Sequence, residues 1–212
     1  MTRERAADAV QKKAIVYDRQ GDAHYDVISA FIKSIRGSDP DAALFWLARM
    51  LEAGEDARYI ARRMVVHASE DIGLADPRAL MIAVAAAQAV EYVGLPEAQL
   101  NLAEAAIYLA RAPKSNSVIA ALGRAQKDAA SADPVPLHLK EPGHPGLRKL
   151  GFGKGYKYPH EYPGHRVDQE YLPARFSGAR YYEPSGEGEE TDPSSEDAPG
   201  TPDGTAEEAP PV

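Results

Sequence analysis

The stretch RGSDPDAALFWLARMLEAGEDARYIARRMVVHASEDIG, from Arg36 to Gly73, decides the fold because it predicts two helices joined by a tight turn. Ser38 is expected to cap the first helix, with Pro40 at its first position. Gly54 is expected to end that helix, because glycine tolerates the left-handed conformation, and the second helix restarts near Asp56. Apolar residues recur at helical spacing in both helices, so the stretch predicts two core helices. They are Leu44, Leu47, Ala48 and Leu51, then Ile60, Met64, Val65 and Ala68.

Similar patterns flank this stretch. Helices are expected for residues 2–18, for a segment that carries Val27 to Ile35, for residues 78–92, and for two segments that carry Leu100 to Ala110 and Val118 to Ala125. Residues 78–92 are apolar almost all round, which predicts burial on several sides. About six or seven helices with short connections predict an all-α fold with antiparallel packing.

The C-terminal residues 184–212 differ in composition from the rest. They hold nine Asp and Glu, no Lys or Arg, and six Pro. Such a segment buries too little apolar surface to offset its ordering entropy, so a disordered acidic tail is expected. The net charge of the whole chain is −8, but residues 1–183 hold 24 basic and 23 acidic side chains. The acidic balance therefore does not exclude a nucleic-acid surface on the folded part.

Residues 133–183 are rich in Pro, Gly and aromatic side chains, a composition that disfavours regular helix. Because disordered segments are poor in aromatics, this part is expected to wrap the helices in extended form. Its segment 148–158 alternates cations with rings. Phosphates and bases are bound by such side chains, so we take these as candidate nucleic-acid contacts: Arg148, Lys149, Lys154, Tyr156, Lys157 and Tyr158.

Other chemistry finds little support. The chain has no cysteine, which excludes disulfides and thiolate metal sites, and the spacing of its histidines matches no standard zinc pattern. Gly151, Gly153 and Gly155 lack the strand and helix that a dinucleotide fingerprint needs, and Lys154 is not followed by the Ser or Thr of a phosphate loop. We therefore expect no catalytic, cofactor or metal site. Ser69-Glu70-Asp71 favours a helix end with salt bridges, and the segment 114–117 favours a helix cap over a phosphate or partner contact.

Several blocks carry a more specific signal. RGSDPDAALFWLARMLEAGED, ARRMVVHASEDIGLADP, AVAAAQAVEYVGLPEAQLNLAEAAIYLARAPKSNS, GFGKGYKYPHEYPG, QEYLP and RYYEP follow one another along the chain. In this order they resemble the C-terminal region of the bacterial replication-associated recombination protein A family (RarA, also called MgsA). These are AAA+ ATPases related to clamp loaders. The signature positions are Gly37, Ser38, Asp39, Pro40, Trp46, Ser69, Glu70, Asp71, Gly73, Lys114, Ser115, Asn116, Gly153 and Gly155.

The resemblance implies a domain order. Residues 1–20 would end the lid of an ATPase module, 21–132 would form a helical oligomerisation domain like the clamp-loader collar, 133–183 would wrap it, and 184–212 would be the disordered acidic tail. The ATPase module would precede Thr2, so the chain is expected to be a fragment and not itself an enzyme. ATP and magnesium are expected only in that missing module.

The resemblance also implies a function in DNA replication, recombination and repair at stalled forks. The expected partners are other subunits in a homotetramer, DNA and the single-stranded DNA-binding protein, in a cytoplasmic, nucleoid-associated setting without membrane contact. The alternative is a stand-alone module that binds single-stranded nucleic acid through residues 148–158.

Overall fold

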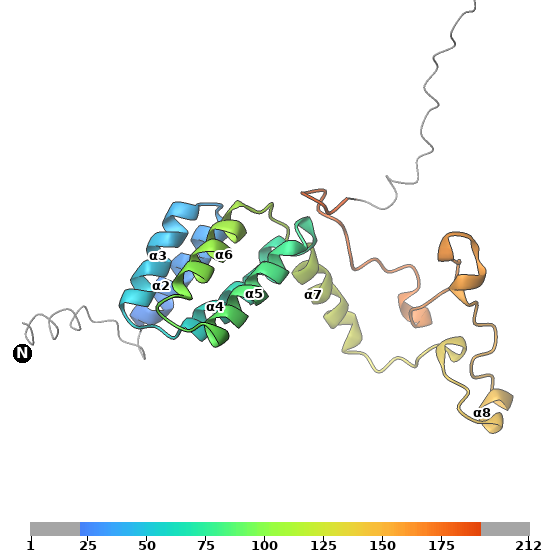
Figure 1. Cartoon of the computed structure of the whole chain (residues 1–212). Helices are drawn as coiled ribbons and strands as arrows, with labels where there is room; N and C mark the ends of the chain where they lie inside the picture. The colour runs from blue at the N-terminus through green and yellow to red at the C-terminus, as the bar shows by residue number, and fades with distance from the viewer. Residues whose placement is uncertain (1–21, 192–212) are drawn as a thin grey trace, which may run out of the picture. The chain divides into compact units, whose positions relative to one another are not determined.

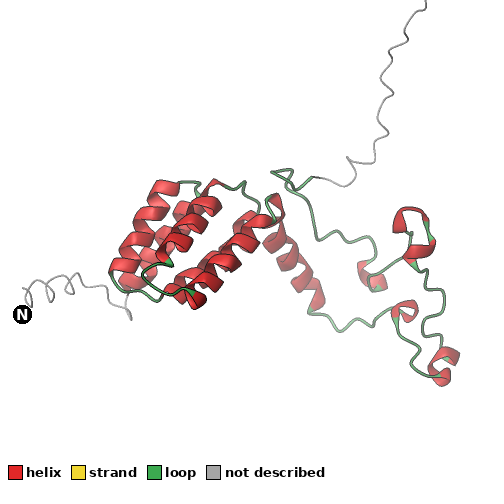
Figure 2. Cartoon of the chain, in the orientation of Figure 1, coloured by secondary structure: helices red, strands yellow, loops and turns green. Residues whose placement is uncertain are grey.

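The computed structural model describes residues 22–191, and Figure 1 shows their path. The expected helix at residues 2–18 and most of the acidic tail lie outside the described residues. Within them the chain is all-α, with no strand (Figure 2). No helix in residues 22–191 is long and apolar enough to cross a membrane. The chain divides into two compact units. The first consists of the residues up to Ile119 and those from Pro184 onward, and the second consists of Ala120–Glu183.

Among the described residues, the first unit packs five helices into a bundle. They are α2 (Asp22–Arg36), α3 (Pro40–Glu52), α4 (Ala57–His67), α5 (Arg78–Tyr92) and α6 (Gln99–Arg111). Helix α2 packs on α3, and α4 packs on α5. Helix α6 packs on both α3 and α5 (Figure 1). A π-helical turn, η1 (Ala68–Ile72), continues α4, and a 3₁₀ turn, η2 (Gly73–Ala75), follows it. The largest fully buried side chains are Phe31, Ile35, Leu47, Met50, Ile60, Met64, His67, Ile72, Leu102 and Leu109.

Most predicted helix ends are confirmed. Pro40 opens α3, Gly54 follows it with φ of 76°, and Asp56 caps α4 by accepting from the Arg58 N–H. The cap of α3 is one residue later than predicted. Asp39 accepts from the Ala42 N–H, whereas Ser38 adopts a left-handed conformation with φ of 60°. Ser38 therefore turns the chain between α2 and α3, and its hydroxyl is available for a different contact.

The predicted inward face is confirmed only in part for two helices: Leu47 of α3 and Ala110 of α6 are buried as expected, but other residues are not. Helix α3 buries Ala43, Leu47 and Met50, while Ala48 is exposed. Helix α6 buries Leu102, Ala105, Ala106, Leu109 and Ala110, while the expected core residue Leu100 is 77% exposed. These helices carry apolar residues on more than one stripe, so spacing alone does not select the face that meets the core.

Helix α5 differs from the prediction in another way. Only Ala79, Ala83, Ala86 and Val90 are buried, and all four lie on one face. On the opposite side, exposed apolar residues recur at helical spacing along the helix. We call this surface the α5 apolar face; its residues are Leu80, Met81, Val84 and Tyr92.

The second unit consists mostly of short turns and extended chain. It contains the C-terminal part of α7 (Ser117–Ala129), the short helix α8 (Pro145–Lys149) and the 3₁₀ turns η3 (Leu137–Leu139), η4 (Pro159–Glu161), η5 (Pro163–His165) and η6 (Ala174–Phe176). Arg124 Nε donates to the Tyr181 carbonyl at 2.8 Å, and the Tyr181 hydroxyl donates to Asp128 at 2.9 Å. These bonds fix the end of the extended chain on α7. That this unit wraps the bundle stays a prediction.

Candidate functional site

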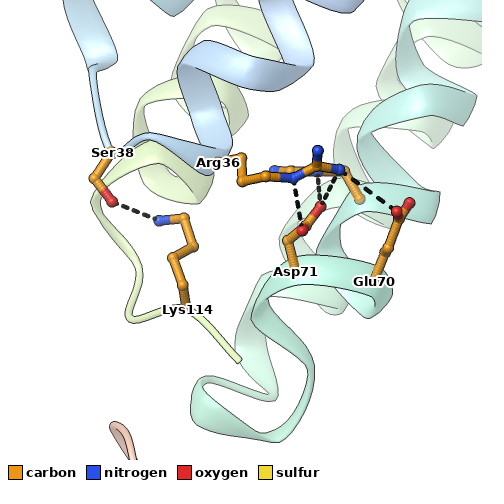
Figure 3. A network of polar contacts seen from close by, with 6 residues as sticks. Arg36, Ser38, Glu70, Asp71 and Lys114 are labelled. Atoms are coloured by element: carbon orange, nitrogen blue, oxygen red, sulfur yellow. Dashed lines mark hydrogen bonds and ion pairs between the residues drawn. The ribbon is translucent and has the colours of Figure 1, made fainter. Parts of the chain in front are cut away.

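Three of the signature blocks meet in one cluster of charged and polar side chains, which we call the polar junction. It consists of Arg36, Ser38, Glu70, Asp71 and Lys114 (Figure 3). Arg36 is the last residue of α2, Glu70 and Asp71 lie in the turn after α4, and Lys114 follows α6. The C-terminal ends of helices carry partial negative charge, so the cations of Arg36 and Lys114 are favourable at the ends of α2 and α6.

The centre of the polar junction is a two-point ion pair between Arg36 and Asp71. Arg36 Nε donates to Asp71 Oδ1 at 2.8 Å and its Nη2 to Oδ2 at 3.0 Å, while Nη2 also lies 3.4 Å from Glu70 Oε1. This geometry matches the planar guanidinium to a carboxylate. The hydrogen bonds with Asp71 raise the pKa of Arg36. Both carboxylate oxygens of Asp71 are engaged, so the geometry is that of a joint between helices.

Lys114 closes the other side of the polar junction. Its ammonium donates to the Ser38 hydroxyl at 3.1 Å, and to the carbonyls of Ala110 at 2.9 Å and Ala112 at 2.5 Å. All three donors of the ammonium are thereby used. Burial lowers the pKa of Lys114. Lys114 thus satisfies carbonyls at the end of α6 and connects them to the turn that opens α3.

A histidine that the sequence reading passed over lies beneath this cluster. His67 is fully buried, and its Nδ1 lies 2.6 Å from Asp71 Oδ2, a close approach that is not aligned as a hydrogen bond. Burial, with smaller effects from the charges of Arg36 and Lys114, lowers the pKa of His67 to about 4, against the opposing effect of Asp71. The imidazole is therefore neutral at pH 7. Its place on the inner face of α4 was the signal that could have identified it.

The backbone conformation of Gly73 favours glycine, and the packing around it is tight. Gly73 has φ of 53°, and a Cβ at this position would lie 3.2 Å from Val118 Cγ2. The Ser115 N–H donates to the Asp71 carbonyl at 2.9 Å. The segment after α6 is therefore held directly against the turn after α4.

Ser115 and Ser117 also bind a segment from the far end of the described chain. Both hydroxyls donate to the carboxylate of Glu190, Ser115 at 2.5 Å, and the Ser185 hydroxyl donates to it at 2.6 Å. Glu190 is only 3% exposed. We call residues 185–191 the clasp. Disorder was predicted from Pro184 onward, and this prediction is wrong for the clasp, because a buried carboxylate with serine donors fixes it on the bundle.

Backbone contacts complete the clasp. The Glu189 N–H donates to the Ala75 carbonyl at 2.8 Å, and Arg78 Nη2 lies 2.9 Å from Glu189 Oε1. Gly188 has φ of 58°, and a Cβ built there would lie 2.1 Å from the Ala75 oxygen. Only glycine permits this approach.

The predicted nucleic-acid contacts lie in the second unit. All six side chains, those of Arg148, Lys149, Lys154, Tyr156, Lys157 and Tyr158, are exposed. Lys157 also donates from Nζ to the Asp168 carbonyl at 2.9 Å. Tyr156 and Tyr158 line one hollow together with His138, Lys140 and Tyr171, which the sequence reading did not select. Those three are distant in sequence from the segment 148–158, so no local pattern joins them to it.

Three further signature positions, Trp46, Gly153 and Gly155, lie outside the polar junction. Trp46 packs against the core and lies 5.5 Å from the Arg49 guanidinium, and Gly153 takes a φ of 72° beside Pro142. Gly155 has φ of 84° with open space around it. Within residues 22–191, no group of three or more His, Asp or Glu side chains is arranged to hold a metal ion.

Comparison with known proteins supports the resemblance that the signature blocks indicate. The family model "MgsA AAA+ ATPase C terminal" matches residues 37–197, and the model "AAA C-terminal domain" matches residues 1–36. An AAA domain-containing protein of Mycobacterium tuberculosis is 56% identical over 86% of this chain and 41% of its own length. Replication-associated recombination protein A of Bacillus subtilis is 50% identical over 87% of this chain and 44% of its own length. The protein of that name in Escherichia coli K12 is 43% identical over 81% of this chain and 39% of its own length.

The chain thus spans less than half the length of these relatives, and the part it matches is C-terminal by the description of the family model. The resemblance seen in the signature blocks is confirmed, and three of those blocks build the polar junction. Because that model matches most of its length, and because 50% of the residues in the aligned 87% of the chain are identical to the Bacillus subtilis relative, the chain belongs to the family of the replication-associated recombination (MgsA) AAA+ ATPases, as their C-terminal region.

Proposed function

We propose that this chain is the collar that assembles subunits of a replication-associated recombination ATPase into a homotetramer. The observation that carries the proposal is the α5 apolar face. Met81 is 63% exposed, Leu80 41% and Val84 37%, and Tyr92 at the end of the helix is 93% exposed. Several large apolar side chains exposed along one helix are typical of a contact with another protein. A second copy of the chain is the occupant that fits the collar role.

The polar junction also supports this role. The polar junction joins the ends of α2, α4 and α6 through Arg36, Asp71 and Lys114. A face that must meet an identical neighbour benefits from helices whose relative positions are fixed, because less entropy is then lost on association.

The test is the molar mass of the 212-residue chain by size-exclusion chromatography with light scattering. The wild-type chain should form a stable oligomer, and Met81→Glu with Val84→Glu should shift it to monomer. Leu150→Glu is the matched control, since Leu150 is 67% exposed in the second unit and should leave the mass unchanged. A wild-type chain that stays monomeric at every concentration overturns the proposal.

The activity of the complete protein extends this proposal. We place ATP and magnesium in an ATPase module of the full-length protein, which acts on DNA at stalled forks with the single-stranded DNA-binding protein, in the cytoplasm at the nucleoid. The relatives' names support the link to replication and recombination, and the Dictyostelium discoideum relative, 42% identical over 86% of this chain, is named an ATPase.

A second function is favoured by the exposure of the segment 148–158. Its cations and rings reach solvent, as a surface that tracks a phosphate backbone requires. We propose that it contacts single-stranded nucleic acid. Lys154→Gln with Lys157→Gln should weaken binding of a single-stranded oligonucleotide and reduce its salt dependence. A pure scaffold has no such binding to lose.

A further inference from the structure

The hollow in the second unit is formed by three segments that are distant in sequence. Its volume is about 580 Å³, within the range of sites for small organic groups. Tyr156, Tyr158 and Tyr171 line it and are 45%, 52% and 49% exposed, so each residue is about half accessible to solvent. His138 and Lys140 lie in the same wall, together with the carboxylate-bearing Glu141.

Specific bonds hold these segments together. The Gly153 N–H donates to the Leu137 carbonyl at 2.9 Å, and Gly153 packs so closely on Pro142 that a Cβ would lie 3.2 Å from its Cδ. These two contacts of Gly153 join the turn before Tyr156 to the segment that carries His138 and Lys140.

The third segment is fixed in the same manner. The Lys157 N–H donates to Gln169 Oε1 at 2.7 Å, and His138 Nε2 bonds to the Glu170 carbonyl at 2.7 Å. Glu170 in turn accepts from the N–H of Leu172 at 3.0 Å. These backbone and side-chain bonds therefore hold the segments that carry the three tyrosines around one space.

Half-exposed rings beside cations suit a flat, aromatic group that carries a phosphate. Stacking on a tyrosine holds a nucleobase without selecting its sequence, because every base has a π-face. Lys140 lines the hollow, and its Nζ lies 5.0 Å from the centre of the Phe152 ring. Lys154 and Lys157 stand exposed on the neighbouring turn. These charges favour a nucleic acid over a neutral peptide as the occupant.

We propose that this hollow is a base-stacking subsite, in which Tyr156, Tyr158 and Tyr171 receive an unpaired base of single-stranded nucleic acid while Lys140 and Lys154 face its phosphates. The subsite rests on the nucleic-acid role proposed for the segment 148–158. It adds a defined place for the base and three residues outside that segment: His138, Lys140 and Tyr171.

The experiment compares two probes by fluorescence anisotropy: a labelled oligodeoxythymidylate and an abasic oligomer of equal length. Both carry the same phosphates, but only the first can stack. The wild-type chain should bind the thymidylate about tenfold more tightly or better. Tyr156→Ala with Tyr158→Ala should abolish this preference and leave binding of the abasic oligomer unchanged, which also shows that the variant is folded.

Two matched variants sharpen the result. Tyr156→Phe with Tyr158→Phe keeps the rings and should retain the preference, and Tyr162→Ala, a tyrosine 37% exposed and outside the hollow, should retain it too. Equal binding of both probes, or a preference that survives the alanine variant, overturns the stacking subsite and leaves phosphate binding standing. If neither probe binds, the nucleic-acid role itself is wrong.

Discussion

Arg36 and Asp71 are 35 residues apart in sequence, and their side chains meet in a two-point ion pair of 2.8 and 3.0 Å at the ends of two helices. The Arg36 side chain is 47% exposed and that of Asp71 is 12% exposed, so solvent screens the pair only in part. Arg36→Ala should therefore lower the free energy of unfolding by about 1 kcal/mol, measured by urea denaturation.

The bundle offers a control for this prediction. Arg58 and Glu91 also form an ion pair, at 2.6 Å, but their side chains are 67% and 54% exposed. Arg58→Ala should cost less than Arg36→Ala, because an exposed pair contributes little. Arg36→Lys should recover only part of the loss, since an ammonium cannot make two parallel bonds. Equal costs at both arginines would contradict a special role for the polar junction.

The buried His67 predicts a dependence of stability on pH. Its pKa is lowered from 6.5 to about 4 in the folded chain, so the unfolded chain binds a proton at a higher pH than the folded chain does. Stability is then fully present above pH 6.5 and is lost as the pH falls toward 4. The loss from this residue is on the order of 3 kcal/mol. His67→Gln should flatten the curve between those two pH values in urea titrations, and a curve that keeps its slope would assign the effect to other groups.

Local signals predicted the helix ends well, and for a physical reason. Pro40, Gly54 and Asp56 act through their own backbone or the next turn, so neighbouring residues suffice to assign them. The inward face of α6 depends instead on which neighbour covers it. Because both Leu100 and Leu102 lie on apolar stripes, the distinction between them needs tertiary contacts.

The candidate sites show the same division. The blocks around Ser38, Asp71 and Lys114 were selected by family resemblance, yet their meeting in one junction depends on the packing of three helices. Glu190 was missed because it is one of nine acidic residues in residues 184–212, and composition does not distinguish a buried carboxylate from the eight others. No local pattern indicates that the hydroxyls of Ser115 and Ser117 will donate to its carboxylate.

Glu190 should contribute strongly to the stability of the first unit. Glu190→Ala leaves the buried hydroxyls of Ser115 and Ser117 without their acceptor, which should cost about 2 kcal/mol. Glu187→Ala, at an exposed carboxylate of the same clasp, should cost nearly nothing. Amide hydrogen exchange at Glu189, whose N–H donates to Ala75, reports directly on opening of the clasp and should accelerate only in the first variant.

Gly188 tests the same contact from the backbone. Gly188→Ala and Gly186→Ala both place a Cβ on a residue with positive φ, at 58° and 78°, so each pays a conformational cost of about 1 kcal/mol. Only at Gly188 does the new Cβ meet another group, the Ala75 oxygen at 2.1 Å, whereas nothing lies within 4 Å at Gly186. Gly188→Ala should therefore open the clasp and accelerate exchange at Glu189, and Gly186→Ala should not. Since Glu190→Ala opens the same contact, combining it with Gly188→Ala should add little further loss in urea denaturation. Additive losses would mean that the two residues stabilise the bundle independently, and that residues 185–191 do not act as one clasp.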